Sequence, residues 1–267
     1  KFLNYMPFII KNMDYEKQYR NILNNITTYG KYKKDRTGVG CHSLFNQSIN
    51  ISVEKYFPIL TGRKMFCKIF NTEFKWFISG KTNIEMFKEN NIKIWNEWAD
   101  ENGDLGPVYG FQLRNYNGKG LDQLKAIINS LKQEPESRRH IITLWNPLQT
   151  HLMALPPCYL YFQFFVDGNK LNMFVVQRSG DMFLGVPYDM ALFTTVLNYI
   201  CYKTNYTPGK LNVNIIDAHI YVNHKNAVDM YRLEKTFILP EYKFNIEEGV
   251  ELTNYQCGKN ITAPVAV

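Results

Sequence analysis

The chain has 267 residues, 45% of them hydrophobic, 15% aromatic and 21% charged, with a formal net charge of +7. This length and composition are those of a globular protein with a full core, and they exclude a disordered or fibrous chain. No apolar run approaches the roughly 18 residues of a membrane-spanning helix, so we expect no association with a membrane.

The first half of the chain predicts helices. The opening segment, 1–13, has a basic start but lacks the long apolar region and cleavage site of a signal peptide, so we expect it to be the first element of the mature fold. Residues 15–29 have the pattern of an amphipathic helix. The stretch GLDQLKAIINSLKQEPESRR predicts a clearer helix that stops before Pro135. Its apolar residues recur at helical spacing: Leu121, Leu124, Ile127, Ile128 and Leu131.

The second half predicts a hairpin and a buried helix. The runs YLYFQFFV and KLNMFVVQR, joined by the turn DGN, indicate two paired strands with Leu171, Met173 and Val175 on one face. After Pro187, YDMALFTTVLNYICYKTN is apolar enough for a helix buried on most sides. Because helices and strands mix without regular alternation, the class is α+β, or an irregular α/β fold, around a substantial sheet.

Nothing in the sequence divides it into parts. There is no internal repeat, low-complexity block or Pro/Ser-rich linker, so we expect residues 1–267 to form a single domain. The cysteines are odd in number and lack CxxC or paired spacing, which argues against a disulfide scaffold or a metal site and for a reducing, cytoplasmic compartment. They are Cys41, Cys67, Cys158, Cys201 and Cys257.

Cys158 is the first candidate for chemistry. It follows two prolines at the entrance to a predicted strand, in LPPCYLYF. A cysteine in such a place is either a buried structural residue or a rigidly held nucleophile whose pKa nearby arginines could lower. The residue pattern alone leaves both interpretations open.

Several other residues suit an anionic ligand. The adjacent Arg138 and Arg139 are either a solvated pair or bidentate donors to a phosphate. Arg36 lies in the glycine-containing turn DRTGVG, which is compatible with an anion cradle. His219 and Tyr221 are two residues apart on a predicted strand and therefore share a face, as a binding pair or simply as a satisfied half-buried pair.

The order of these motifs along the chain strongly resembles the thymidylate synthase family, from about residue 15 to Val267. The motifs that carry the resemblance are DRTGVG, WFISGKTNI, IWNEWADENGDLGPVYGFQLR, SRRHIITLWNP, LPPCYLYFQF, QRSGDMFLGVP, DAHIYVNH and the terminal APVAV.

This resemblance implies a fold, an activity and two partners. The fold is α+β, with a large mixed β-sheet flanked by helices and packed across a homodimer interface. The activity is transfer of a one-carbon unit from 5,10-methylenetetrahydrofolate, the co-substrate, to C5 of a pyrimidine deoxynucleotide monophosphate, with no metal. Cys158 matches the nucleophile that adds to C6 and makes C5 a carbanion equivalent, and Glu73 matches the glutamate that manages proton transfer at the base.

The resemblance also assigns the binding residues. The phosphate ligands are matched by Arg36, Arg178 and Ser179, and the ligands of the sugar 3′-hydroxyl by His219 and Tyr221. Arg138 and Arg139 match arginines that members of this family lend to the phosphate site of the neighbouring subunit. The folate site is matched by Trp95, Trp98, Asp181, Leu184, Gly185 and the terminal Val267. Four guanidiniums around one dianion would also help to keep Cys158 a thiolate.

Three residues depart from the family pattern. Tyr159 replaces the histidine that usually follows the nucleophile, in the polar network beside the substrate base. Asn96 replaces an aspartate between the two tryptophans. Both changes could rearrange water beside the base. Asp189, in PYD, replaces the asparagine of PFN that reads the base edge.

Asp189 has two interpretations. As an acid in the first turn of a helix it would gain about 0.3–1 kcal/mol from the helix dipole. As a base reader it would select cytosine, because an ionised carboxylate has no donor for O4 of uracil but accepts from the cytosine 4-amino group and from a protonated N3. A site built on such buried polar groups rejects the wrong base by roughly 10⁴–10⁵ at best.

An aspartate at this position is similar to the deoxycytidylate hydroxymethylases of the same superfamily. The sequence therefore predicts conversion of dCMP to 5-hydroxymethyl-dCMP. The alternatives are methylation of dCMP, methylation of dUMP by an enzyme that tolerates the aspartate through protonation, and a catalytically idle relative that uses the +7 charge to bind nucleic acid. The distribution of charge argues against nucleic-acid binding, because the basic residues are spread along the chain and do not form a patch.

Overall fold

The structure, a computed structural model, describes residues 15–266. The segment 1–13, which was expected to form the first element, and Val267, expected at the folate site, lie outside the described residues. Within residues 15–266, no helix has both the length and the apolar character needed to cross a membrane.

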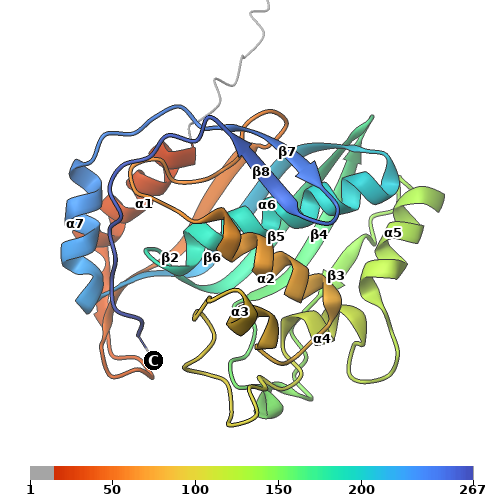
Figure 1. Ribbon diagram of the computed structural model, residues 1–267, viewed down its shortest axis with the longest axis horizontal. Helices are drawn as coiled ribbons and strands as arrows, with labels where there is room; N and C mark the ends of the chain where they lie inside the picture. The colour runs from red at the N-terminus through yellow and green to blue at the C-terminus, as the bar shows by residue number, and fades with distance from the viewer. Residues whose placement is uncertain (1–14, 267) are drawn as a thin grey trace, which may run out of the picture.

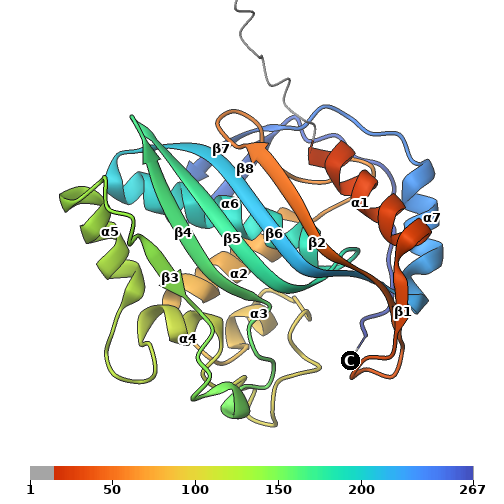
Figure 2. The same cartoon turned by 180° about the vertical axis from the view of Figure 1, so that it is seen from behind.

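A six-stranded mixed sheet forms the centre of the protein (Figures 1 and 2). Its strand order is β1-β2-β6-β5-β4-β3, in which β5 and β6 are parallel and all other neighbours are antiparallel. The strands are β1 (Lys31–Lys33), β2 (Cys41–Ser52), β3 (Ile141–Thr143), β4 (Tyr159–Asp167), β5 (Lys170–Asp181) and β6 (Thr207–Tyr221). A separate pair is formed by β7 (Glu241–Asn245) and β8 (Gly249–Thr253). The expected α+β class with a large mixed sheet is confirmed.

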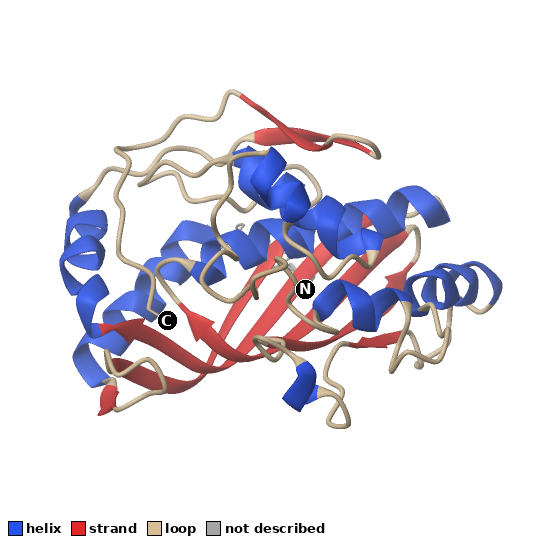
Figure 3. Ribbon diagram, turned by 60° about the horizontal axis from the view of Figure 1, so that its bottom comes forward, coloured by secondary structure: helices blue, strands red, loops and turns tan. Residues whose placement is uncertain are grey.

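Helices cover one face of this sheet, as Figure 3 shows. The largest is α6, which packs against β5, β6 and α2, while α1 packs on β2. At the same end, the Tyr19 ring of α1 meets Tyr231 of α7 in an edge-on contact of 5.6 Å. The helices are α1 (Tyr15–Tyr29), α2 (Cys67–Ser79), α3 (Glu85–Glu89), α4 (Tyr109–Arg114), α5 (Gln123–Gln133), α6 (Gly185–Thr204) and α7 (Lys225–Leu233), with 3₁₀ turns η1 (Thr150–Leu152) and η2 (Val222–His224).

The buried helix α6 begins earlier than the sequence predicts. It starts at Gly185, so Pro187 lies inside its first turn, where a missing N–H costs nothing. Asp189 is consequently the fifth helical residue and not a first-turn acid, which removes the helix-dipole interpretation. Most of the helix is apolar and buried, and each large side chain buried there contributes about 1.5–3 kcal/mol.

The other predicted elements are confirmed, with one change. Helix α1 spans the expected residues, and the β4–β5 hairpin has its turn between Asp167 and Lys170. In α5, Asp122 caps the first turn by accepting a hydrogen bond of 2.9 Å from the Lys125 N–H. Leu121 therefore lies before the helix, where it is half exposed instead of facing the core.

The opposite face of the sheet carries large exposed apolar side chains. Figure 2 shows β4, β5 and β6 toward the viewer with no helix in front of them. From these strands, the side chains left exposed include Phe165, Phe174 and Ile216. Such a surface is typical of a protein–protein interface.

Candidate active site

One cavity of about 670 Å³ collects most of the residues singled out in the sequence. This volume is within the usual range for sites of small molecules. Its walls come from the end of the β5–β6 pair, from α2 and α6, from the loop before β4 and from the C-terminal tail, residues 260–266. The expected residues that line it are Arg36, Glu73, Trp95, Trp98, Cys158, Tyr159, Arg178, Ser179, Asp181, Leu184, Gly185, Asp189, His219 and Tyr221.

Two expected residues do not reach this cavity. Arg138 and Arg139 are exposed between α5 and β3 and are absent from the lining of their own chain's cavity. Asn96 is also exposed and does not line it, so the structure gives no support to a role for Asn96 in the water network beside the base.

The parallel pairing of β5 and β6 explains why the motifs QRSGD and DAHIY meet. Both strands end at the same edge, and their register sets Ser179 beside Asp217 and Asp181 beside His219. Gly180 allows the close approach of α6, because a Cβ there would lie 2.8 Å from methyl carbons of Val186 and Ile215.

Cys158 is held by contacts on both sides of its peptide unit. Its N–H donates to the Tyr109 hydroxyl (2.9 Å), and its carbonyl accepts from the Arg178 N–H (2.7 Å). The Arg178 guanidinium also donates to the carbonyls of Pro157 (2.9 Å) and Pro156 (2.8 Å). One arginine therefore fixes the loop that carries the sulfur.

Burial of Cys158 disfavours ionisation of its thiol within the single chain. Burial raises its pKa above the ordinary value, and although Arg178 opposes that shift, the negative charge of Asp189 adds to it. In the single chain the desolvation of the sulfur outweighs the one nearby guanidinium, so ionisation of Cys158 depends on the further arginines and the bound dianion that the resemblance implies.

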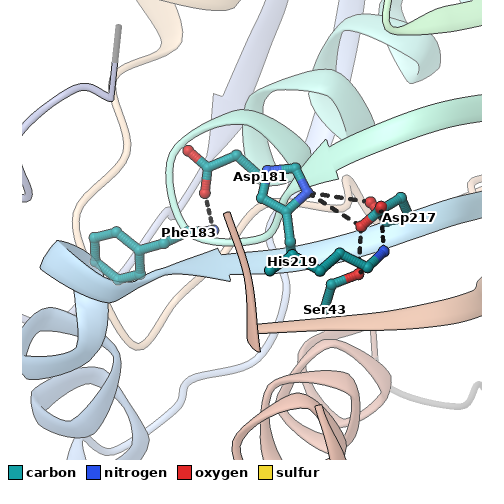
Figure 4. Close-up of polar contacts among 6 residues, drawn as sticks. Ser43, Asp181, Phe183, Asp217 and His219 are labelled. Atoms are coloured by element: carbon teal, nitrogen blue, oxygen red, sulfur yellow. Dashed lines mark hydrogen bonds and ion pairs between the residues drawn. The ribbon is translucent and has the colours of Figure 1, made fainter. Parts of the chain in front are cut away.

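His219 belongs to a polar cluster at the C-terminal ends of β5 and β6 (Figure 4). Its Nδ1 lies 3.2 Å from the carbonyl oxygen of Asp217 and 3.7 Å from the carboxylate oxygen Oδ1. Lys33 donates to Asp217 (2.8 Å), and the Ser43 hydroxyl donates to the same carboxylate. Hydrogen bonds from His219, Lys33 and Ser43 hold the pKa of Asp217 well below its usual range despite partial burial. The His219 ring meets Tyr221 edge-on at 5.0 Å, so the expected pair does share a face.

Asp217 was not predicted as a site residue from the sequence, although its position carried a signal. It lies two residues before His219 on the same strand and therefore on the same face. Gln177 was not predicted as a site residue either, because it lies within the apolar strand β5. Only 1% of it is exposed.

Two carboxyl groups, those of Glu73 and Asp189, line the cavity close enough to affect each other. Burial raises the pKa of Glu73 to about 8, with a further rise from the charge of Asp189 and a partial offset from the Trp95 indole. Burial likewise raises the pKa of Asp189 to about 7, although a hydrogen bond of 2.6 Å from Nε2 of Gln177 lowers it. Near neutral pH the pair therefore holds protons jointly, and the ionisation of one opposes that of the other.

Tyr159 forms an aromatic wall beside these carboxyl groups. Its ring lies 4.6 Å from that of Tyr109, 5.0 Å from Phe193 and 5.7 Å from Phe162, measured between centroids. Burial raises the pKa of Tyr159 well above its ordinary value, so the phenol remains neutral.

Asp181 and Trp98 also line the cavity and suit a flat ligand that presents N–H donors. Oδ1 of Asp181 accepts from the N–H groups of Phe183 (2.9 Å) and Leu184 (3.3 Å), so the carboxylate is oriented by the backbone. Nε1 of Trp98 is buried and has no hydrogen-bond partner within residues 15–266. A pterin ring has donors for the carboxylate and an aromatic face for the indole, so these residues fit a folate.

Residues 15–266 contain no group of three or more His, Cys, Asp or Glu side chains placed to hold a metal ion.

The family model described as thymidylate synthase matches residues 17–267. The match covers the strands, helices and tail that build the cavity. Members of this family carry out folate-dependent transfer of a one-carbon unit to a pyrimidine nucleotide, with methylenetetrahydrofolate as co-substrate. The chain belongs to the thymidylate synthase family and is an enzyme of one-carbon transfer.

Proposed function

We propose that the protein transfers the one-carbon unit to C5 of deoxycytidylate and releases 5-hydroxymethyl-dCMP. The observation that carries this proposal is the Asp189 carboxyl group, which lines the cavity near Glu73 where the family pattern has an asparagine. Because α6 begins at Gly185, this carboxyl group has no part in capping the helix and is free to meet a ligand.

The polarity of residue 189 fits cytosine. Gln177 donates to Oδ2 of Asp189, which leaves Oδ1 as an acceptor for the base. Cytosine presents a 4-amino donor and, once C6 has been attacked, a basic N3 that takes a proton. Uracil presents O4, an acceptor, against which an ionised carboxylate is unfavourable.

Cys158, Asp189 and Glu73 together support covalent addition. The Cys158 thiol would lose its proton as its sulfur bonds to C6 and the C5–C6 π electrons shift toward C5, while N3 takes up one proton in exchange, and ionised Asp189 stabilises the protonated N3. Glu73, with a pKa of about 8, holds a proton near neutral pH and can relay it at the base. When bound, 5,10-methylenetetrahydrofolate supplies the one-carbon unit, held by Asp181 and Trp98.

Formation of a hydroxymethyl product requires the addition of water, whereas formation of a methyl product requires hydride transfer from the folate. Tyr159 in place of a histidine changes the polar groups beside the base, which supports a different water arrangement there. The known cytosine-specific relatives mostly hydroxymethylate, and this also favours the proposed product over 5-methyl-dCMP.

The second candidate is methylation of dUMP, and the pKa of about 7 at Asp189 favours it in acid. A protonated carboxyl group has a donor for O4 of uracil. The two functions therefore differ in the protonation state that each requires of Asp189.

We also propose that the enzyme is a homodimer in which Arg138 and Arg139 reach the phosphate site of the neighbouring subunit. Both arginines are exposed and lie outside their own cavity, and the uncovered sheet face offers an apolar interface. In each cavity they would join Arg36 and Arg178 around the dianion.

Mass spectrometry of the products from dCMP, dUMP and CMP with 5,10-methylenetetrahydrofolate tests the proposal. We expect 5-hydroxymethyl-dCMP from dCMP and little turnover of dUMP. The absorbance of dihydrofolate separates the products, because methylation oxidises the folate and hydroxymethylation does not. A preference for dUMP with formation of dihydrofolate would overturn the proposal in favour of thymidylate synthesis.

A further inference from the structure

His224 lies behind the cavity wall, between Asp181 and the C-terminal tail, and none of its side chain is exposed. Its Nε2 is 2.8 Å from the carbonyl oxygen of Pro264. Its Nδ1 is 3.4 Å from Oδ1 of Asp181, at ion-pair distance. The rings of Tyr221 (5.4 Å) and Phe183 (5.8 Å) pack around it. The side chain therefore contacts both the tail and an acid of the cavity.

The contacts define the protonation state of His224. A neutral imidazole has one N–H and one lone pair, whereas here Nε2 is at hydrogen-bond distance from one acceptor oxygen and Nδ1, which makes no hydrogen bond among the described residues, is at ion-pair distance from another. A neutral ring would turn its lone pair toward either the carbonyl or the carboxylate, in a place closed to water. The ion-pair distance to Asp181 therefore favours an imidazolium, whose charge that carboxylate balances, over either neutral tautomer.

The charges around the ring agree with this assignment. Burial lowers the pKa of His224, but the Asp181 carboxylate and the Pro264 carbonyl outweigh it, so that the pKa lies above its ordinary value. Arg63 opposes them; it lies before α2, and its guanidinium donates to the Phe183 carbonyl. Asp181 shows the reciprocal shift: burial raises its pKa, yet His224, with His219 adding to the effect, holds that pKa below the usual range.

The tail that His224 contacts is itself a wall of the cavity. The lining includes tail residues Asn260, Ile261, Thr262, Ala263, Val265 and Ala266, together with Asp181. His224 contacts both the Pro264 carbonyl in the tail and Asp181, so it can influence two parts of the same cavity wall.

We propose that His224 is a positioning residue whose imidazolium ties the C-terminal tail to Asp181 and so closes the folate end of the cavity. The role in catalysis rests on the proposed placement of the folate between Asp181 and the tail. Because the pKa of His224 is raised, the tie is present in acid and near neutral pH and is lost as the pH rises through that raised pKa. Loss of the proton leaves one acceptor without a donor and releases the tail.

The test compares His224→Gln with the matched control His140→Gln. His140 is equally buried but contacts Ser130 and Pro135, away from the cavity. Digestion of the tail by carboxypeptidase, followed by mass spectrometry across pH, reports tail release without any turnover. We expect tail protection in wild type and in the control that decreases at alkaline pH, and roughly tenfold faster digestion of His224→Gln with no pH dependence, within the range usual for coupled sites.

Binding measurements add a readout that general destabilisation would not reproduce. His224→Gln should weaken tetrahydrofolate binding by roughly tenfold, measured with dCMP present, while the Kd of dCMP alone stays within about twofold of wild type. Equal digestion of His224→Gln and wild type at every pH, or an equal loss of nucleotide and folate binding, would overturn the proposal.

Ring ¹⁵N shifts of the wild-type protein test the proposal even if the variant fails to fold. The chain has five histidines, and one buried ring should remain doubly protonated above the ordinary histidine pKa of about 6.5. A neutral tautomer for every buried ring would overturn the assignment. If wild type binds no tetrahydrofolate but its tail protection still depends on pH, the His224 contact stands and the folate placement alone fails.

Discussion

Oδ2 of Asp189 accepts a hydrogen bond of 2.6 Å from Nε2 of Gln177, and this contact fixes which polar group meets the substrate base. Gln177 is held by strand β5 and is almost fully buried, so its amide cannot turn to solvent. Oδ2 of Asp189 therefore accepts from the Gln177 amide, and Oδ1 remains available to the base. An asparagine in the same place would give its oxygen to Gln177 and present its NH₂ group instead.

Gln177→Leu should shift the pH dependence of dCMP turnover. The Gln177 hydrogen bond lowers the pKa of Asp189, so its removal raises that pKa above about 7 and leaves less of the ionised form near neutral pH. The acidic limb of kcat/KM for dCMP should move to higher pH, with roughly tenfold lower activity at pH 7 and recovery in alkali. A pH-rate profile that keeps its shape would show that Gln177 does not control Asp189.

Cys158→Ser should abolish turnover and leave nucleotide binding largely intact, because an alcohol at its free pKa is a poor nucleophile. Cys257→Ser is the matched control, since Cys257 is also partly buried but does not line the cavity. Turnover is measured by product formation and binding by calorimetry. Appreciable activity in Cys158→Ser would remove this residue from the mechanism.

Arg138→Ala should be inactive alone and regain partial activity when mixed with Cys158→Ser chains. If the arginine serves the neighbouring subunit, some hybrid dimers carry one complete site. Lys132→Ala, at the end of helix α5 and six residues before Arg138, should be active without mixing. Once subunit exchange has been demonstrated by mass spectrometry, no recovery would place Arg138 in its own site or in none.

The sequence predicted elements with strong local patterns and failed where tertiary contacts decide. The helix of residues 15–29 and the β4–β5 hairpin follow from periodicity and turn residues. The start of α6 was predicted too late because Pro187 was interpreted as a boundary, although proline is accepted within a first turn. Leu121 fits helical spacing, yet the Asp122 cap excludes it from α5.

The candidate site was predicted mainly through motifs, whereas its supporting residues were not. Gln177, Asp217 and His224 act through partners distant in sequence: Asp189, Lys33 and the tail carbonyl of Pro264. A sequence does not show which residues face each other across parallel strands or beneath a tail. The effect of burial on the Cys158 thiol was likewise not predictable, because burial cannot be weighed against the arginines without the cavity.

Asp189→Asn should change how stability depends on pH. The folded protein keeps the Asp189 proton up to about pH 7, whereas the unfolded chain loses it near pH 4. Wild-type stability therefore falls as pH rises through this window, because the unfolded state binds fewer protons there. The advantage of Asp189→Asn in denaturant melts should grow from about pH 4 to about pH 7, by up to a few kcal/mol, and then level off. The exposed Glu251→Gln should show no such trend; a constant difference for Asp189→Asn would mean that the folded carboxyl group is not desolvated.

The same substitution should reverse the base preference. Asp189→Asn should lower kcat/KM for dCMP and raise it for dUMP, changing the ratio by at least a hundredfold, or on the order of 3 kcal/mol. The amide supplies the donor that O4 of uracil lacks in wild type, and it removes the carboxylate that stabilises protonated N3 of cytosine. The acidic limb for dCMP should disappear with it, because no group at residue 189 remains to be ionised. The measurement is steady-state kinetics with both nucleotides over pH 5 to 9. An unchanged ratio would place discrimination elsewhere in the cavity, with Tyr159 as the next residue to exchange, and a wild type that prefers dUMP would show that Asp189 does not select cytosine.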